Sequence, residues 1–312
     1  MLEEIKKSEK STIIVDGELL ESAKEYYRLN YSKVIPPKRE GKYREVFNKK
    51  RIDERLDLIS RQLNLNLKGL DLLEIGSGFG TFVAVSQMRG INCFGVEPEQ
   101  ISSHSSTKLI EKVNVRKTIT RAIGENLPFK DETFDIVVSF QVLEHTKNPE
   151  KVLKESIRVL KDGGYVYFVI PNYNSFWEGH YGLLWLPRFP KRLAKIYLRI
   201  MDRDPQFIDD IQYITPRRIL NALRRENVQI LSLGKEIWDE RIDSLNFSTW
   251  GYTEKLLRLL KIAKRLKITP LIRFLGKKFD FYYPIILILR KIQNKDNMHS
   301  KPGSYCNFFW KT

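Results

Sequence analysis

The chain has 312 residues, of which 42% are hydrophobic and 29% charged, a composition typical of a globular protein and not of a disordered or fibrous one. Its formal net charge of +16 calls for an anionic partner, such as nucleic acid, a membrane surface or an acidic substrate. Two cysteines, Cys93 and Cys306, are too few for a disulfide framework or a zinc cluster, and they fit a reducing compartment.

The start of the chain and its apolar runs predict a cytoplasmic protein. The first ten residues, MLEEIKKSEK, carry no apolar core after their charges, so we expect no secretory signal. The longest strongly apolar run, Phe281 to Leu289, is interrupted by Pro284 and is far shorter than the roughly 20 residues of a membrane-spanning helix. We therefore expect no transmembrane segment.

The N-terminal region predicts helices. Residues Glu18–Tyr31 and Arg44–Leu63 carry apolar side chains at helical spacing, and the stretch VIPPKREGK between them is typical of a loop. We expect residues 1–64 to form a helical cap.

From Leu70 onward, short apolar strands alternate with helical segments. An order of strand, helix and strand indicates parallel strands joined by right-handed crossovers. The segment KDGGY, Lys161–Tyr165, predicts a helix stop and a turn. The expected strands are Leu70–Ile75, Cys93–Val96, Phe134–Phe140 and Tyr165–Ile170, and the expected helices are Thr81–Met88 and Glu150–Leu160.

After Pro171 the alternation gives way to an aromatic-rich stretch and then to basic helices. Thr215 and Pro216 have the types expected at the N-cap and first position of a helix. The expected elements are helices Lys191–Met201, Pro216–Glu226 and Tyr252–Lys267, a strand Val228–Gly234, and a loose tail over 293–312.

The positive charge lies in the C-terminal half. Ten lysines or arginines occur from Arg188 to Arg225 and nine from Lys255 to Lys278. Segments 191–203 and 255–278 combine these charges with apolar stripes. Two interpretations stay open: the stripes pack on the protein's own core, or the helices make peripheral contact with an anionic membrane, at its inner face.

The segment DLLEIGSGFGTF, Asp71–Phe82, predicts a ligand site where a strand runs into a helix. Its glycines allow close approach of a ligand to the backbone. They are spaced G-x-G-x-G, and Thr81 holds the third glycine position of a dinucleotide fingerprint. Glu74 would repel a pyrophosphate and suits a cation, while Glu97 at the end of the next strand can accept both ribose hydroxyls. A ribose with a cationic group and no phosphate describes S-adenosyl-L-methionine.

Four stretches in order carry a family resemblance: LLEIGSGFG, GVEP, ENLPFKDETFDIVVSFQVLEH and RVLKDGGYVYFVIPN. Over residues 65–233 the chain resembles the class I S-adenosylmethionine-dependent methyltransferases, in the methyltransferase type 11 subgroup that includes ubiquinone-biosynthesis-type enzymes. The resemblance implies an α/β fold: a doubly wound, Rossmann-like, seven-stranded sheet, mostly parallel with an antiparallel last strand, plus N-terminal helices and helical insertions.

The resemblance also implies a domain layout. Tyr283–Lys291 would be the antiparallel last strand and pair with Val228–Leu233. The cofactor-binding domain would then comprise 65–234 and 281–292. Residues 172–214 would cover the acceptor, and residues 235–280 would form a basic helical insertion.

The cofactor site follows from the resemblance residue by residue. Glu97 would bind the ribose, with Pro98 beside it. The position where the family commonly has an acidic residue for the adenine amine is Ile123, so adenine would rely on backbone groups near Ile123 and Gly124. The methionine side and the reacting methyl would be lined by Glu74, Gly76, Ser77, Gly78, Gly80, Ser139, Phe140 and Gln141.

The candidate catalytic residues are two histidines. An activated sulfonium methyl requires alignment of the acceptor, and a hydroxyl acceptor also requires a base. His145, just beyond the strand Phe134–Phe140, is the first candidate, although it and Glu144 can equally brace the loop. His180 is a candidate base or substrate contact. The sequence offers no His/Asp cluster at metal-ligand spacing, so no metal is expected.

The aromatic residues Trp177, Tyr181 and Trp185 fit either an acceptor wall or a core. The preferred function is methyl transfer to an oxygen of a small-molecule, glycan or lipid-linked acceptor. RNA methylation is an alternative prompted by the pI of about 9.6, but no RNA-binding module or base-amine signature follows the fourth strand, which argues against nucleic acid as a partner. A non-catalytic scaffold at a membrane surface is the third alternative.

Overall fold

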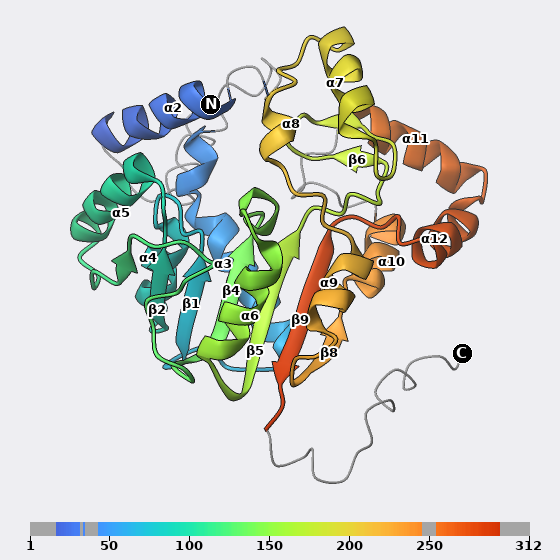
Figure 1. Cartoon of the computed structure of the whole chain (residues 1–312). Helices are drawn as coiled ribbons and strands as arrows, with labels where there is room; N and C mark the ends of the chain where they lie inside the picture. Colours follow the sequence, from blue (N-terminus) through green and yellow to red (C-terminus); the bar gives the residue numbers. More distant parts are fainter. Residues whose placement is uncertain (1–16, 32–33, 35–42, 245–253, 294–312) are drawn as a thin grey trace.

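A computed structural model describes residues 17–31, 34, 43–244 and 254–293, and the fold is built on one seven-stranded sheet (Figure 1). Its strand order is β3-β2-β1-β4-β5-β9-β8. The predicted tail lies outside the described residues from 294 onward. The strands are β1 (Asp71–Ile75), β2 (Asn92–Val96), β3 (Ile119–Thr120), β4 (Phe134–Phe140), β5 (Leu160–Ile170), β8 (Val228–Ser232) and β9 (Ile285–Lys291).

The strands of the sheet run in the predicted directions. Strands β1 to β5 pair in parallel, whereas β9 runs antiparallel to both β5 and β8. The segment Tyr283–Lys291 therefore supplies the antiparallel strand that pairs with 228–233, as expected. The Rossmann-like fold class is confirmed.

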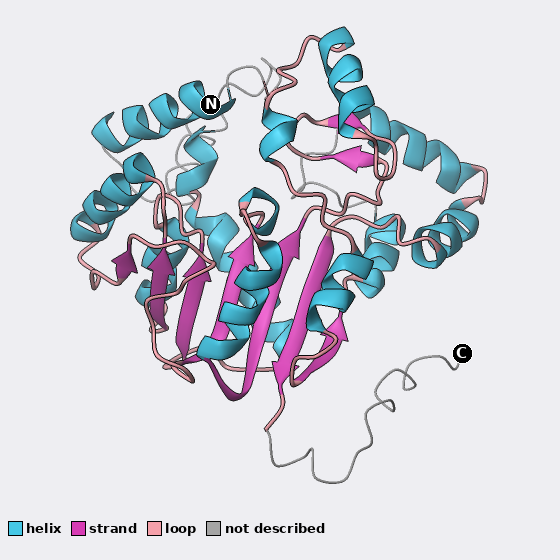
Figure 2. Cartoon of the chain, in the orientation of Figure 1, coloured by secondary structure: helices cyan, strands magenta, loops and turns pink. Residues whose placement is uncertain are grey.

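The helices lie on both faces of the sheet and beyond its carboxyl end (Figure 2). The first described ones are α2 (Gly17–Tyr31), α3 (Lys49–Leu63), α4 (Thr81–Met88), α5 (Gln100–Lys112), the short 3-10 helix η2 (Leu143–His145) and α6 (Pro149–Val159). They are followed by α7 (Lys191–Ile200), α8 (Phe207–Asp210), α9 (Pro216–Leu223), α10 (Lys235–Ser244), α11 (Glu254–Arg265) and α12 (Thr269–Lys278).

Two hydrophobic cores sandwich the sheet because successive strand side chains point to opposite faces. In β1, Leu72 joins the core beneath α3 and α4, and Leu73 joins the core beneath α6 and α9. In β5, Tyr167 belongs to the first core, while Val166 and Phe168 belong to the second. The near-continuous apolar runs of these strands are thus explained by burial on both faces.

The segment KDGGY is not the turn that its glycines predict. Helix α6 ends at Val159 and β5 begins at Leu160 without an intervening loop. The glycines instead permit an irregularity within β5. Gly163 has φ of +78°, and a Cβ on Gly164 would lie 2.8 Å from the Asp135 carbonyl oxygen. The register between β4 and β5 shifts at this place.

Helix boundaries elsewhere follow from their caps. Helix α3 begins at Lys49, later than predicted, because the Asn48 side chain accepts a hydrogen bond from the Arg51 amide. Helix α9 begins as predicted, with the Thr215 hydroxyl accepting from the Arg218 amide and Pro216 in the first turn.

The region after β5 forms a small cap with a core of its own above the carboxyl ends of β4 and β5 (Figure 1). It contains the hairpin β6 (Trp177–Glu178) and β7 (Leu183–Leu184), followed by α7 and α8. Trp177, Tyr181 and Trp185 are buried in this region, so they belong to a core and do not form a wall facing a cavity.

Helices α10, α11 and α12 form the predicted insertion before β9. Helix α12 packs on α10, where a Cβ on Gly276 would clash with the ring of Trp238. Among the described residues, no helix combines the length and apolarity that crossing a membrane requires.

Candidate cofactor and acceptor site

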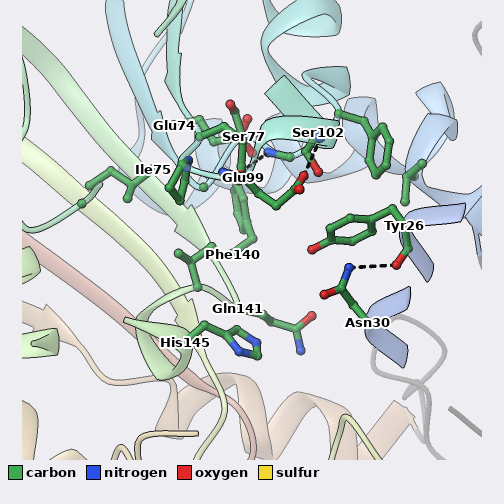
Figure 3. Close-up of a pocket in the computed structure, with 18 of the residues that line it drawn as sticks. Tyr26, Asn30, Glu74, Ile75, Ser77, Glu99, Ser102, Phe140, Gln141 and His145 are labelled. Carbon is green, nitrogen blue, oxygen red and sulfur yellow. Dashed lines mark hydrogen bonds between the residues drawn. The ribbon is translucent and has the colours of Figure 1, made fainter. Parts of the chain in front are cut away.

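A cavity of about 900 Å³ lies at the carboxyl ends of β1, β2 and β4, beneath α2 and α3 (Figure 3). This volume is within the range of small-molecule and cofactor sites, about 300–1,000 Å³. Its walls include most of the residues that the sequence predicted for a cofactor. These are Glu74, Gly76, Ser77, Gly78, Glu97, Pro98, Ile123, Gly124, Phe140 and Gln141.

The glycine turn after β1 provides an open cradle. The amides of Gly76 and Ser77 both donate to the Val96 carbonyl, at 2.9 and 3.0 Å, which ties the turn to the end of β2. Gly76 has φ of +76° and a Cβ there would clash with Val142. Gly78 has φ of +52°, and a Cβ there would meet nothing within 4 Å. The space beside Gly78 is therefore open to a ligand.

Glu97 is held rigidly at the rim of this cradle, with 8% of its surface exposed. One carboxylate oxygen accepts from the Gly78 amide at 2.7 Å, and the other accepts from the Glu99 amide at 2.9 Å. Burial raises the pKa of Glu97 despite these two hydrogen bonds. Each oxygen keeps a second lone pair, so the side chain can still accept from two hydroxyls of a ligand.

Glu74 is a buried carboxylate with an unmet hydrogen-bonding capacity. It is 5% exposed, and its Oε2 has no hydrogen-bond partner among the described residues. Burial raises the pKa of Glu74 to about 8, against the opposing influence of the Arg55 guanidinium. A cationic ligand beside Glu74 would favour the ionised carboxylate.

Arg55 is a site residue that the sequence reasoning missed. It projects from α3 into the cavity wall and its guanidinium lies 4.0 Å from the ring centroid of Phe140. Burial lowers the pKa of Arg55 to about 10, assisted by the neighbouring Arg51. A sequence signal did exist, because Arg55 stands within the buried stripe of α3, three residues after Ile52 and four before Ile59.

Helix α2 contributes a second missed wall. Tyr26 and Asn30 face the cavity from the side opposite the strand ends (Figure 3). The Tyr26 ring contacts Phe79 edge-on, with centroids 5.6 Å apart. Burial, together with the Glu97 carboxylate, raises the pKa of Tyr26 to about 12, so its hydroxyl is a donor at neutral pH. Nothing in the sequence of α2 indicated which strand ends it covers.

Two predicted cofactor residues do not line the cavity. Gly80 is the N-cap of α4, with φ of +76°, and a Cβ there would clash with Ile119 and Ser106. Ser139 is buried in β4 and its hydroxyl donates to the Ile75 carbonyl at 3.0 Å. Both therefore shape the sheet and the turn without facing a ligand.

The two candidate catalytic histidines lie together. His145 lines the cavity, across from Glu74 and Ser77 (Figure 3), whereas His180, between β6 and β7 in the cap, is not among its lining residues. Their Nε2 atoms are 3.1 Å apart. Burial lowers the pKa of His145. Burial would also lower that of His180, but the carboxylates of Glu178 and Glu144 raise it to about 10. Because His145 Nε2 faces His180 Nε2, only the rest of the His145 ring is available to an acceptor.

Residues 73–168 match the family described as "Methyltransferase domain". The match runs from β1 to β5 and so includes the glycine turn, Glu97 and the end of β4. Residues 73–168 form a methyltransferase domain. S-adenosyl-L-methionine is the cofactor that this domain implies.

The methyltransferase domain also accounts for the similarity to curated proteins. An uncharacterized methyltransferase of Mycolicibacterium vanbaalenii is 34% identical over 36% of this chain and 42% of its own length. Norajmaline N-methyltransferase of Rauvolfia serpentina is 32% identical over 36% of this chain and 39% of its own length. The chain thus spans less than half the length of these relatives.

Two other similar proteins cover more of their own length. The uncharacterized protein MJ1123 of Methanocaldococcus jannaschii is 28% identical over 58% of this chain and 76% of its own length. Among solved structures, an S-adenosylmethionine-dependent methyltransferase of Thermotoga maritima is 24% identical, covers 56% of this chain and 73% of its own, and has a TM-score of 0.38.

The residues around the cavity of the methyltransferase domain fit S-adenosyl-L-methionine. The unpaired oxygen of Glu74 suits a cation, the second lone pairs of Glu97 suit the ribose hydroxyls, and the open side of Gly78 leaves room for the ligand. Ile123 presents a half-exposed apolar side chain to the cavity, which suits the face of adenine.

Proposed function

We propose that the chain transfers the methyl group of S-adenosyl-L-methionine to an oxygen of a small-molecule, sugar or lipid-linked acceptor. The observation that carries the proposal is the junction of Glu97 with the glycine turn: a buried carboxylate fixed by the Gly78 amide at 2.7 Å, opening on a cavity of about 900 Å³. The Glu97 carboxylate would accept hydrogen bonds from a ribose diol, next to a backbone turn that is open to the ligand.

The residues have distinct roles in binding. Glu97 would hold the ribose, Ile123 and Gly124 would contact adenine, and Glu74 would stabilise positive charge. Arg55, as a planar cation fixed over Phe140, suits the carboxylate of the methionine moiety. The bound cofactor supplies an activated methyl group, so the protein's remaining task is to align the acceptor oxygen and exclude water.

The acceptor would enter on the side of His145 and Gln141. These residues line the cavity together with Phe207 and Asp210 from the cap. His145 would therefore contact the acceptor, whereas His180 would act only through His145, because it does not line the cavity.

Calorimetry tests the first half of the proposal. Wild-type protein is titrated with S-adenosyl-L-homocysteine, with one site per chain expected, and Glu97→Ala serves as the site variant. Loss of Glu97 removes the acceptor of two ligand hydroxyls and should weaken binding at least tenfold. No binding to the wild type would defeat the proposal.

Transfer is then measured with a radiolabelled methyl donor. Extract fractions of lipids, glycans and RNA are incubated separately with the protein, and label is expected in the lipid or glycan fraction. Label in RNA alone would contradict a lipid or glycan acceptor and would support the RNA methyltransferase alternative. Cofactor binding without transfer to any fraction would support the scaffold alternative.

The cap and the last helices support a lipid-linked acceptor. Helix α7 buries Ala194 and Leu198 but leaves Leu193, Ile196 and Ile200 exposed, with Ile200 at 76%. On α11, α12 and the turn between them, the exposed large apolar side chains include Ile262, Leu266, Leu271 and Phe274. Lysines and arginines are interspersed on the same helices, which suits the surface of an anionic bilayer.

Sedimentation with vesicles tests this surface. Phosphatidylcholine vesicles with and without phosphatidylglycerol are compared, and binding to the anionic vesicles is expected to weaken as salt is added. The double variant Leu193→Glu with Ile200→Glu should lose binding, and Leu220→Glu on α9, where the side chain is also exposed, should keep it. Equal sedimentation of all three proteins would contradict the proposed peripheral contact.

A further inference from the structure

Four titratable side chains form a cluster beside the cavity: Glu144, His145, Glu178 and His180, here named the His–Glu cluster. Glu144 and His145 belong to η2, the turn after β4, whereas Glu178 belongs to β6 in the cap. His145 and His180 are 35 residues apart in the sequence. Sequence spacing therefore indicated no metal site, and it is the packing of the cap against η2 that brings these groups together.

Three of the cluster's atoms have the spacing of metal ligands. The Nε2 atoms of His145 and His180 are 3.1 Å apart, and Glu144 Oε1 lies 3.8 Å from the first and 3.6 Å from the second. A circle through the three atoms has a radius of about 2.0 Å, within the range of Zn–N and Zn–O bonds, about 2.0–2.2 Å. One ion can thus contact all three without rearrangement.

Glu144 is the second, independent observation. It is 0% exposed, and neither of its carboxylate oxygens has a hydrogen-bond partner among the described residues. A buried carboxylate without hydrogen bonds is costly, and in the metal-free protein its compensation is an ion pair with a protonated His180 at 3.6 Å. The separations of 3.6 and 3.8 Å from the histidine nitrogens are too long for hydrogen bonds. A cation at the centre of the triangle would supply the missing partner.

Glu178 contacts the metal ligand His180 and would not contact the ion itself. Its Oε1 lies 2.7 Å from His180 Nδ1, which fixes the ring so that Nε2 points to the other two ligands. Glu178 is itself held by the Tyr181 amide at 2.7 Å and by the Tyr173 hydroxyl at 3.2 Å. A carboxylate that orients a histidine through its second nitrogen is a common feature of metal sites.

We propose that Glu144, His145 and His180 bind one divalent transition-metal ion, with Glu178 as the residue that positions His180. Two imidazoles and one carboxylate favour ions such as Zn²⁺, Co²⁺ or Fe²⁺ over Mg²⁺ or Ca²⁺, which prefer oxygen ligands. Three protein ligands leave coordination positions open. Of the three ligands His145 alone lines the cavity, so an open position would reach the acceptor only beside His145. Holding an acceptor oxygen there is a role that rests on the proposed function.

A metal-free network is the competing interpretation. The His180 ring would then be a cation paired with Glu178 and would donate from Nε2 to His145. This network pairs the two Nε2 atoms but leaves both oxygens of Glu144 without a hydrogen bond, with the His180 cation at 3.6 Å as the partner of their charge. A measurement of metal binding distinguishes the metal site from this metal-free network.

The experiment uses the full chain after chelator treatment and dialysis. ZnCl₂ is titrated by calorimetry in the absence of cofactor, and CoCl₂ is added while the visible absorption is recorded. One equivalent of each ion is expected, with Co²⁺ giving d–d bands of a low-coordinate nitrogen and oxygen site. His145→Ala and His180→Ala should abolish the bands, and Glu178→Gln should weaken Zn²⁺ binding about 10- to 100-fold. His104→Ala, on an exposed position of α5, is the matched control and should bind as the wild type does.

The outcome does not depend on the cofactor, so failure of this inference and failure of the proposed function are separate results. Absence of stoichiometric Zn²⁺ and Co²⁺ binding to the wild type would overturn the metal site without the use of any variant. Unchanged binding in His145→Ala, shown by circular dichroism to be folded, would overturn the ligand assignment.

Discussion

Gly78→Ala is the sharpest test of how the glycine turn serves the cofactor. The backbone there has φ of +52°, in the left-handed region, and an added Cβ meets no protein atom within 4 Å. The cost to folding is therefore conformational alone, about 1–2 kcal/mol. For a protein of this size, that corresponds to a fall in Tm of roughly 1.5–3 °C.

The cost to binding should be larger because the new methyl group occupies space in the cavity. Inserting a methyl group into a filled site costs about 1–3 kcal/mol, so we expect the Kd for S-adenosyl-L-homocysteine to rise about ten- to hundredfold. Gly69→Ala is the matched control: Gly69 has φ of +80°, equally open surroundings, and a place before β1, at the other end of the strand.

The assay is calorimetric titration of wild type and both variants, with thermal unfolding measured on the same samples. Both variants should lose similar stability, and only Gly78→Ala should lose affinity. If Gly78→Ala binds the cofactor as tightly as Gly69→Ala does, the space beside Gly78 is not where the ligand lies, and the proposed placement is wrong.

Three further predictions concern charged residues of the same site. Glu97→Gln keeps the shape of the side chain but removes its charge, so cofactor affinity should fall about 10- to 100-fold in calorimetry, in line with about 1.5–3 kcal/mol for charge-assisted hydrogen bonds; an unchanged Kd would contradict ribose recognition. Glu74, with a pKa of about 8 in the free protein, is mostly protonated at pH 7, and a cationic ligand favours its ionised form. Affinity for S-adenosyl-L-methionine should therefore increase as pH rises from 6 through 8 and level off only above about 9, and titrations in buffers of different ionisation enthalpy should show proton release. Glu74→Gln should remove that part of the pH dependence, and a variant that retains all of it would refute the assignment. Arg55→Met should weaken binding at least fivefold through loss of the methionine carboxylate's partner, whereas Arg61→Met, at an exposed position on the same helix, should not; equal Kd values for the two would exclude Arg55 from the site.

The sequence by itself determined the class of fold and the cofactor end of the site. Alternating strands and helices predicted the sheet and the glycines from Gly76 predicted the cradle, whereas the antiparallel strand at Tyr283–Lys291 was implied by the family resemblance. These signals are local, because strand periodicity, glycine spacing and a carboxylate at the end of a strand act over a few residues. Where a local signal served another purpose, as at Gly163 and Gly164, the predicted turn was wrong.

Only the tertiary structure decided which residues from other elements complete the site. The Arg55 and Tyr26 side chains reach the cavity because α3 and α2 pack across strand ends that follow them in the chain. The meeting of Glu144 with His180 likewise depends on how the cap packs over η2. Such contacts join segments tens of residues apart, and no periodicity in either segment encodes its distance from the other. The cap's own hydrophobic core, which buries Tyr181 and Trp185, fixes those distances.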